Sequence, residues 1–139
     1  MPDSGQRTEG ATSDSKLNLL LGIDLEDVRD HVPDGSRYQD RLGFNVERIL
    51  RFLDDHQTKA TFFTVGLVAR RLPSLVKTIA DEGHELASHS DRHVQLNKLT
   101  PEEFSSDLKR SIDALEQVGS HRVSGFRAPT FSLTPSCEW

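Results

Sequence analysis

Two histidines spaced four residues apart stand out in the segment GHELASHSDRH, which runs from residue 83 to residue 93. His89 and His93 follow a short apolar run in a chain that contains only six histidines. Neutral imidazoles and carboxylates are common ligands of Zn²⁺ and similar divalent ions. Residues four apart on one helical turn present both rings to the same side, so the pair indicates a metal site. Spacing alone is weak evidence, since paired histidines are usually ordinary surface residues.

Acidic and basic side chains occupy a comparable position after other predicted strands. Three acids, Asp24, Glu26 and Asp27, end the first strand, and Arg127 ends the last. Because the carboxyl ends of parallel strands share one face, we expect these side chains to meet the two histidines there. A metal in such a pocket lowers the pKa of bound water, and a nearby carboxylate can take the proton. Arg127 would hold that carboxylate or stabilise negative charge. The residues therefore predict a metal-assisted hydrolysis.

The elements that position these residues alternate between strand and helix. Apolar and β-branched runs predict strands over residues 17–25, 59–65, 84–88 and 122–128. Apolar residues at helical spacing predict helices around residues 46–53, 72–79 and 104–118. Thr100, Pro101 and Glu103 have the pattern of a capping box that opens the third helix. The β-α-β-α-β-α-β order predicts an α/β fold, with a parallel sheet and outer helices.

Composition narrows the class of protein. The 139 residues suffice for one domain, and the net charge of −5 disfavours a nucleic-acid partner. Residues 1–16 are polar and predict a disordered tail, with the folded domain over residues 17–139. No secretory signal and no apolar run of about 20 residues occurs in the sequence, so we expect a cytoplasmic protein without a transmembrane segment. His31 falls in a predicted loop and is expected to face solvent.

These motifs together resemble those of the NodB-homology polysaccharide deacetylases, carbohydrate esterase family 4. HSDRH (residues 89–93) is similar to the family's His-[Ser/Thr]-x-x-His metal motif, FRAPTFS (126–132) to its Arg-x-Pro motif, and ATFFTVG (60–66) to its second strand. The resemblance runs from about Leu17 to Trp139. DLED and FRAPTFSLTP are especially similar to the subgroup found with bacterial exopolysaccharide synthesis. The resemblance implies the N-terminal part of a distorted (β/α) barrel, truncated before the family's later motifs.

The resemblance also implies an activity: removal of N- or O-acetyl groups from sugars of an acetylated polysaccharide or cell-wall glycan. The implied cofactor is a divalent ion, Zn²⁺ first, with Co²⁺, Ni²⁺ or Mn²⁺ as alternatives. By this resemblance, His89 and His93 correspond to metal ligands, and Arg127 corresponds to the residue that orients the base.

The first motif can be aligned with the family's acid pair in two ways. If the last two residues of DLED are aligned with the family's two aspartates, Glu26 is the base and Asp27 is the metal ligand. Matching Asp24 to the first aspartate makes Asp24 the base and leaves Glu26 or Asp27 as the ligand. We favour Asp27 as the ligand and leave the base between Asp24 and Glu26.

Two other functions compete with the deacetylase. One is a catalytically inactive module that binds glycan or a partner, which the absence of a late general-acid histidine would explain. The other is an allantoinase-like hydrolase that acts on non-peptide C–N bonds outside sugars. The intact set of acids, histidines and arginine favours a hydrolase.

Overall fold

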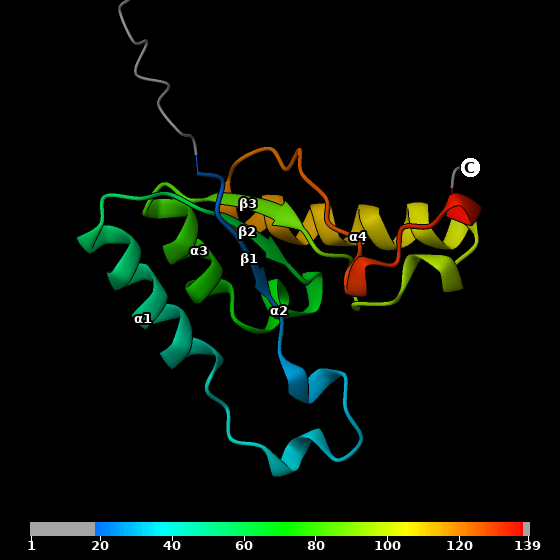
Figure 1. Cartoon of the computed structure of the whole chain (residues 1–139), viewed down its shortest axis with the longest axis horizontal. Helices are drawn as coiled ribbons and strands as arrows, with labels where there is room; N and C mark the ends of the chain where they lie inside the picture. The colour runs from blue at the N-terminus through cyan, green and yellow to red at the C-terminus, as the bar shows by residue number, and fades with distance from the viewer. Residues whose placement is uncertain (1–18, 138–139) are drawn as a thin grey trace, which may run out of the picture.

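A small parallel sheet forms the centre of the chain, as a computed structural model that describes residues 19–137 shows. Its strands β1 (Gly22–Leu25), β2 (Thr61–Thr64) and β3 (Glu85–Ser88) lie in that order (Figure 1). Both pairings are parallel. All three carboxyl ends therefore meet at one edge of the sheet. The predicted polar tail, residues 1–16, and the predicted start of the first strand lie outside the described residues.

Helices connect the strands, as the sequence predicts. They are α1 (Leu42–Asp55), α2 (Gly66–Arg71), α3 (Pro73–Asp81) and α4 (Pro101–Gly119). The short helix α2, which directly follows β2, was not predicted. Leu72 separates it from α3 because a residue before proline is disfavoured in the α conformation, and Leu72 has φ −125° and ψ 56°. In the part of the chain that the structure describes, no helix is long and apolar enough to cross a membrane.

The two faces of the sheet have different roles. Ile23, Phe62 and Leu86 are aligned across the three strands and belong to the apolar core. Helices supply the rest of this core, including Val76 and Ile79 of α3 and Leu115 of α4. Because side chains alternate along a strand, the next aligned set, Asp24, Phe63 and Ala87, belongs to the opposite face. The core thus fixes a strand register that leaves Asp24 away from it.

The predicted fourth strand, residues 122–128, is wrong in extent, because only one bridge forms, between Ser88 and Phe126. The Ser88 amide donates to the Gly125 carbonyl at 2.8 Å, and the Arg127 amide donates to the Ser88 carbonyl at 2.9 Å. Earlier in the segment, the amide of Val123 donates instead to Glu116 of α4 at 2.9 Å. This bond occupies an amide that a longer strand could use. The single bridge nevertheless fixes Arg127 beside the end of β3.

The predicted capping box of α4 is confirmed. The Thr100 hydroxyl accepts from the Glu103 amide at 3.2 Å, and the Glu103 carboxylate accepts from the Thr100 amide at 2.8 Å. Since α4 packs on α2, α3 and β3, its start anchors a large part of the domain.

Replacing the capping threonine should therefore destabilise the fold. We expect Thr100→Ala to lower the free energy of unfolding by about 1 kcal/mol, because the Glu103 amide loses its acceptor. Thr78→Ala removes the same hydroxyl from an exposed position within α3 and should change stability by less than about 0.5 kcal/mol. Urea unfolding of both variants checks this expectation, and equal losses would contradict it.

Candidate metal and base site

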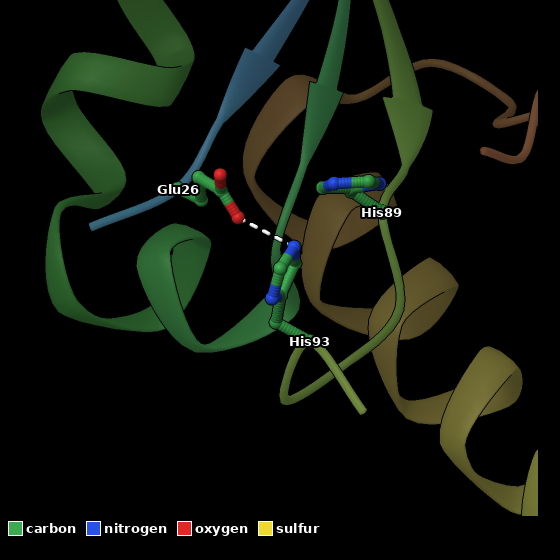
Figure 2. Close-up of side chains that lie close together, drawn as sticks. All are labelled: Glu26, His89 and His93. Carbon is green, nitrogen blue, oxygen red and sulfur yellow. Dashed lines mark ion pairs between the residues drawn. The ribbon is translucent and has the colours of Figure 1, made fainter. Parts of the chain in front are cut away.

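Three side chains converge at the carboxyl ends of the strands. Glu26 follows β1, whereas His89 and His93 follow β3. Figure 2 shows the three side chains pointing toward one another across the sheet edge. One donor atom from each lies within 4.8 Å of the others. Ligands of a tetrahedral zinc ion at about 2.0–2.2 Å stand roughly 3.4 Å apart, so small side-chain adjustments would close this group around an ion.

The carboxylate of Glu26 has an unsatisfied atom in this cluster. Its Oε2 lies 2.5 Å from His93 Nε2 but makes no hydrogen bond of acceptable geometry with any described group. A buried carboxylate oxygen without a hydrogen bond is costly, and a bound cation relieves that cost. The chemistry of the donors, one carboxylate and two imidazoles, also fits a divalent transition metal. The residues present therefore fit the metal that the sequence predicts.

His89 is held in the tautomer that a metal ligand needs. Its side chain is 2% exposed, and Nδ1 lies 2.8 Å from the backbone carbonyl oxygen of Arg127. A carbonyl can only accept, so Nδ1 carries a hydrogen, and in the neutral ring the lone pair is therefore on Nε2. That nitrogen lies 3.9 Å from Asp24 Oδ2. The main chain of Arg127 thus prepares His89 for coordination.

The two histidines do not lie on a helical turn, so that part of the sequence prediction is wrong. Residues 89–95 form an irregular loop in which Ser90 and His93 have positive φ angles of 66° and 58°. The hydroxyl of Ser90 accepts from the His93 amide at 2.8 Å and closes the turn. The rings of His89 and His93 pack edge to face, with centroids 4.9 Å apart. Burial lowers the pKa of His93, which favours the neutral, metal-binding form.

The loop that carries the histidines is fixed from two sides by helices. At the start of α2, the Gly66 amide donates to the Ser90 carbonyl and the Leu67 amide to the Asp91 carbonyl, both at 3.0 Å. On the other side, the Asp91 amide donates to the Asp107 carboxylate of α4 at 2.8 Å. The Asp91 side chain is almost fully buried. It pairs with Arg70 at 2.7 Å and with Arg110 at 3.2 Å.

A carboxylate and an arginine lie beside the cluster. Arg127 Nη1 donates to Asp24 Oδ1 at 2.6 Å, and its guanidinium stacks on the Phe63 ring with Cζ 3.8 Å from the centroid. A side chain at Gly22 would collide with this guanidinium, so the glycine leaves room for it. Asp24 Oδ2 makes no side-chain hydrogen bond with a described residue, and its side chain is 33% exposed. The arrangement leaves one oxygen of an oriented carboxylate facing the cluster.

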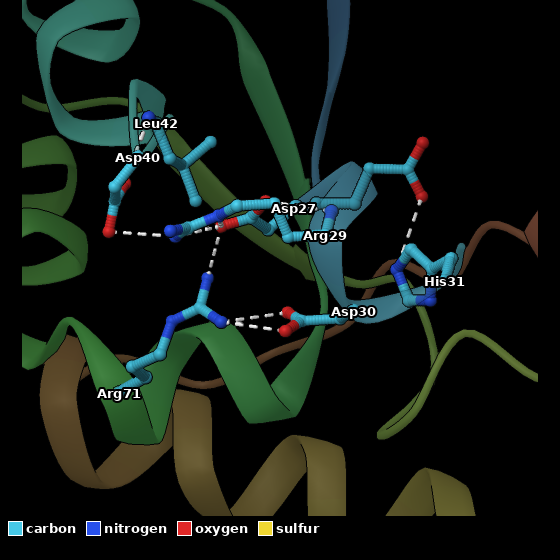
Figure 3. Close-up of polar contacts among 8 residues, drawn as sticks. Asp27, Arg29, Asp30, His31, Asp40, Leu42 and Arg71 are labelled. Carbon is cyan, nitrogen blue, oxygen red and sulfur yellow. Dashed lines mark hydrogen bonds and ion pairs between the residues drawn. The ribbon is translucent and has the colours of Figure 1, made fainter. Parts of the chain in front are cut away.

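Asp27, which we expected to be the metal ligand, lies elsewhere. Figure 3 shows its carboxylate between Arg29 and Arg71 rather than with the histidines. Arg29 donates through Nη2 at 2.7 Å, and Arg71 Nη2 donates at 2.6 Å. The hydrogen bonds of Arg29, helped by the charge of Arg71, lower the pKa of Asp27 to about 2. The geometry therefore supports the alignment that makes Glu26 the ligand and Asp24 the base.

His31 is a further residue near the cluster, and the expectation that it faces solvent is only partly met. Its ring packs on that of His93 with centroids 4.4 Å apart, and its Nε2 lies 4.0 Å from Glu26 Oε2. Its side chain is 22% exposed. No motif in the sequence marks His31, because its contact with His93 depends on how the fold brings their two loops together.

Comparisons with known proteins identify the family to which the chain belongs. A family model described as "Polysaccharide deacetylase" matches residues 34–137. A peptidoglycan-N-acetylglucosamine deacetylase from Bacillus cereus is 33% identical over 82 residues, which are 59% of this chain and 30% of that protein. Chitin deacetylase 1 from Saccharomyces cerevisiae is 28% identical over 107 residues, 77% of this chain and 35% of that protein. The chain therefore spans about a third of the length of these relatives.

Solved structures share the fold. The crystal structure of BA3943 from Bacillus anthracis, a CE4 family pseudoenzyme, superposes with a TM-score of 0.69 at 25% identity. The match covers 85% of this chain and 37% of that one. Because structures of this class have a (β/α) barrel, the predicted α/β architecture of parallel strands and outer helices is confirmed for the part of a barrel that this chain contains.

Two helical glycines test how tightly the histidine loop is held. A Cβ at Gly66 would lie 2.5 Å from Asp91 Oδ1, whereas a Cβ at Gly43 would meet nothing within 4 Å. We expect Gly66→Ala to destabilise the fold by about 1–3 kcal/mol, because the buried Asp91 must move. Gly43→Ala should stabilise α1 by up to about 1 kcal/mol through helix propensity. Chemical denaturation of the two variants checks the opposite signs, and a stabilising Gly66→Ala would contradict the packing described.

Proposed function

The chain belongs to the polysaccharide deacetylase family, and we propose its function on that basis. The reaction we propose is the metal-dependent hydrolysis of an acetyl group, chiefly the acetamide of an N-acetylated hexosamine in a polysaccharide. The convergence of Glu26, His89 and His93 beside the Asp24–Arg127 pair carries this proposal. Relatives named as deacetylases of peptidoglycan N-acetylglucosamine and of chitin support a glycan of this kind as the substrate.

Glu26, His89 and His93 would hold the metal ion. One carboxylate oxygen and two imidazole nitrogens suit Zn²⁺, which leaves further positions for water and substrate. When bound, such an ion lowers the pKa of a water and polarises a carbonyl group. The unsatisfied Oε2 of Glu26 and the Nδ1–H tautomer of His89 support this ligand set.

Asp24 is the residue we assign as general base. Its Oδ1 accepts from Arg127, which keeps the carboxylate ionised and fixed in direction. Its Oδ2 lies 3.9 Å from His89 Nε2, on the side of the ligand cluster, and would accept a proton from a water bound there. Glu26 is the poorer candidate for this role because its carboxylate belongs to the ligand cluster.

The similarity to BA3943 makes an inactive glycan-binding module the second candidate. The complete acid, histidine and arginine set of this chain favours turnover over that alternative. The sequences DLED and FRAPTFSLTP are our basis for placing the chain near the branch associated with exopolysaccharide synthesis.

Substitutions of the base and of the ligands should have different effects. We expect Asp24→Asn to retain zinc and to lower acetate release by about 10²–10⁴-fold, the usual contribution of a general base. We expect His89→Ala and Glu26→Gln to lose zinc, and with it almost all activity, because the first removes a donor atom and the second replaces an anionic carboxylate with a neutral, weaker amide. The measurements are zinc content and acetate release from chitin oligosaccharides and peptidoglycan.

Matched controls separate these roles from general damage. His56→Ala and Asp54→Asn change the same residue types at exposed positions of α1 and its C-terminal end and should leave both readouts unchanged. Retention of zinc and activity by His89→Ala would refute the metal site. Zinc binding without acetate release in the unsubstituted chain would favour the inactive module.

A further inference from the structure

We propose that Asp27 is a positioning residue that decides which of two consecutive acids faces the histidines. Because Arg29 and Arg71 hold the Asp27 side chain, the side chain of Glu26 points toward His89 and His93. This inference rests on the proposed metal site, whose ligand it explains. It assigns Asp27 no direct contact with the metal.

Arg29 and Arg71 hold the Asp27 carboxylate from two sides, and we call this set of contacts the clamp. From its own loop, Arg29 donates through its backbone amide and its side-chain Nε to Oδ1, both at 3.0 Å, and through Nη2 to Oδ2 at 2.7 Å. From α2, Arg71 Nη2 donates to Oδ2 at 2.6 Å. Each arginine has a second acidic partner, Asp40 for Arg29 at 2.7 Å and Asp30 for Arg71 at 2.8 Å (Figure 3). The carboxylate is buried, and both of its oxygens are satisfied.

The backbone conformation links the direction of the Glu26 side chain to that of Asp27. Asp27 has extended torsions, φ −116° and ψ 115°. Successive side chains of an extended segment point to opposite sides, so fixing one of them fixes the direction of its neighbour. With Asp27 held against α2, Glu26 faces the loop of His89 and His93.

The helix that provides the clamp also holds the histidines. Arg71 is the last residue of α2, whose first residues, Gly66 and Leu67, bind the carbonyls of Ser90 and Asp91 in the histidine loop. A helix of six residues is about 9 Å long, which makes α2 a short rigid spacer. Its two ends therefore set the position of Glu26 relative to the two histidines.

Exchange of the two acids is unfavourable for an electrostatic reason. If Asp27 turned to the metal, Arg29 and Arg71 would lose the carboxylate that they share. Each arginine would keep only its outer acid, Asp40 or Asp30, and breaking the buried pairs with Asp27 is destabilising. No arginine among the described residues pairs with Glu26, so turning Glu26 to the metal breaks no such pair. The clamp therefore selects Glu26 as the ligand.

The test is the affinity of the chain for zinc alone. Asp27→Asn keeps the size of the side chain but removes its charge. We expect it to weaken zinc binding by about 10–100-fold, the usual effect of losing a residue that orients a ligand. Asp40→Asn makes the same change at an exposed outer partner of Arg29 and should alter the affinity by less than about twofold. Competition with a chromophoric chelator gives the affinities, and circular dichroism of the zinc-free variants reports folding.

The outcomes separate this inference from the proposed function. Glu26→Gln should weaken zinc binding more than Asp27→Asn, and the reverse order would make Asp27 the ligand and overturn the inference. Wild-type affinity in a folded Asp27→Asn would overturn the inference alone. If the unsubstituted chain bound no zinc, the proposed metal site would fail together with it. If Asp27→Asn does not fold, Arg71→Lys replaces it as the test, because lysine keeps the charge but not the two-armed geometry of arginine. Weaker zinc binding by Arg71→Lys would support the clamp, and unchanged zinc binding would refute it.

Discussion

The hydrogen bonds of Arg127 connect the end of β3, His89 and Asp24 within the candidate site. Its amide donates to Ser88 and fixes the residue at the end of β3, and its carbonyl accepts from His89. Its guanidinium, stacked on Phe63, holds Asp24 at the end of β1. One residue therefore sets the tautomer of a proposed metal ligand through its main chain and the direction of the proposed base through its side chain. The parallel sheet, with its carboxyl ends at one edge, brings these partners within reach.

Burial of charge around the site is tolerated because the charges are paired. The buried carboxylate of Asp27 pairs with two arginines, and that of Asp91 pairs with three. Such pairs contribute little net stability compared with apolar packing, but breaking one of them is costly. Networks of this kind restrict the loops after β1 and β3 to one arrangement. Preorganised loops let a metal bind without a large ordering cost.

Much of this arrangement follows from local sequence patterns. The apolar runs place the strands, and the capping box places the start of α4, because both depend on neighbouring residues. The convergence of Asp24, Glu26 and the two histidines follows from one rule, that parallel strands end together. The family resemblance adds the orientation of the base by Arg127, with which the observed Asp24–Arg127 bond agrees.

Other features depend on residues distant in sequence and could not be predicted. The direction of Glu26 and Asp27 depends on Arg71, which lies 44 residues beyond Asp27. The shape of the histidine loop depends on Ser90 and on α2, so the four-residue spacing resembles a helical turn without being one. The fourth strand is reduced to one bridge because Val123 bonds to α4.

A crystal structure of the chain with Zn²⁺ bound tests the central claim most directly, because it identifies the ligands. We expect Glu26 Oε2, His89 Nε2 and a ring nitrogen of His93 at about 2.0–2.2 Å from the ion. Asp27 should remain bonded to Arg29 and Arg71, and Asp24 to Arg127. A zinc ion held by Asp27, or bound away from His89 and His93, would contradict the account.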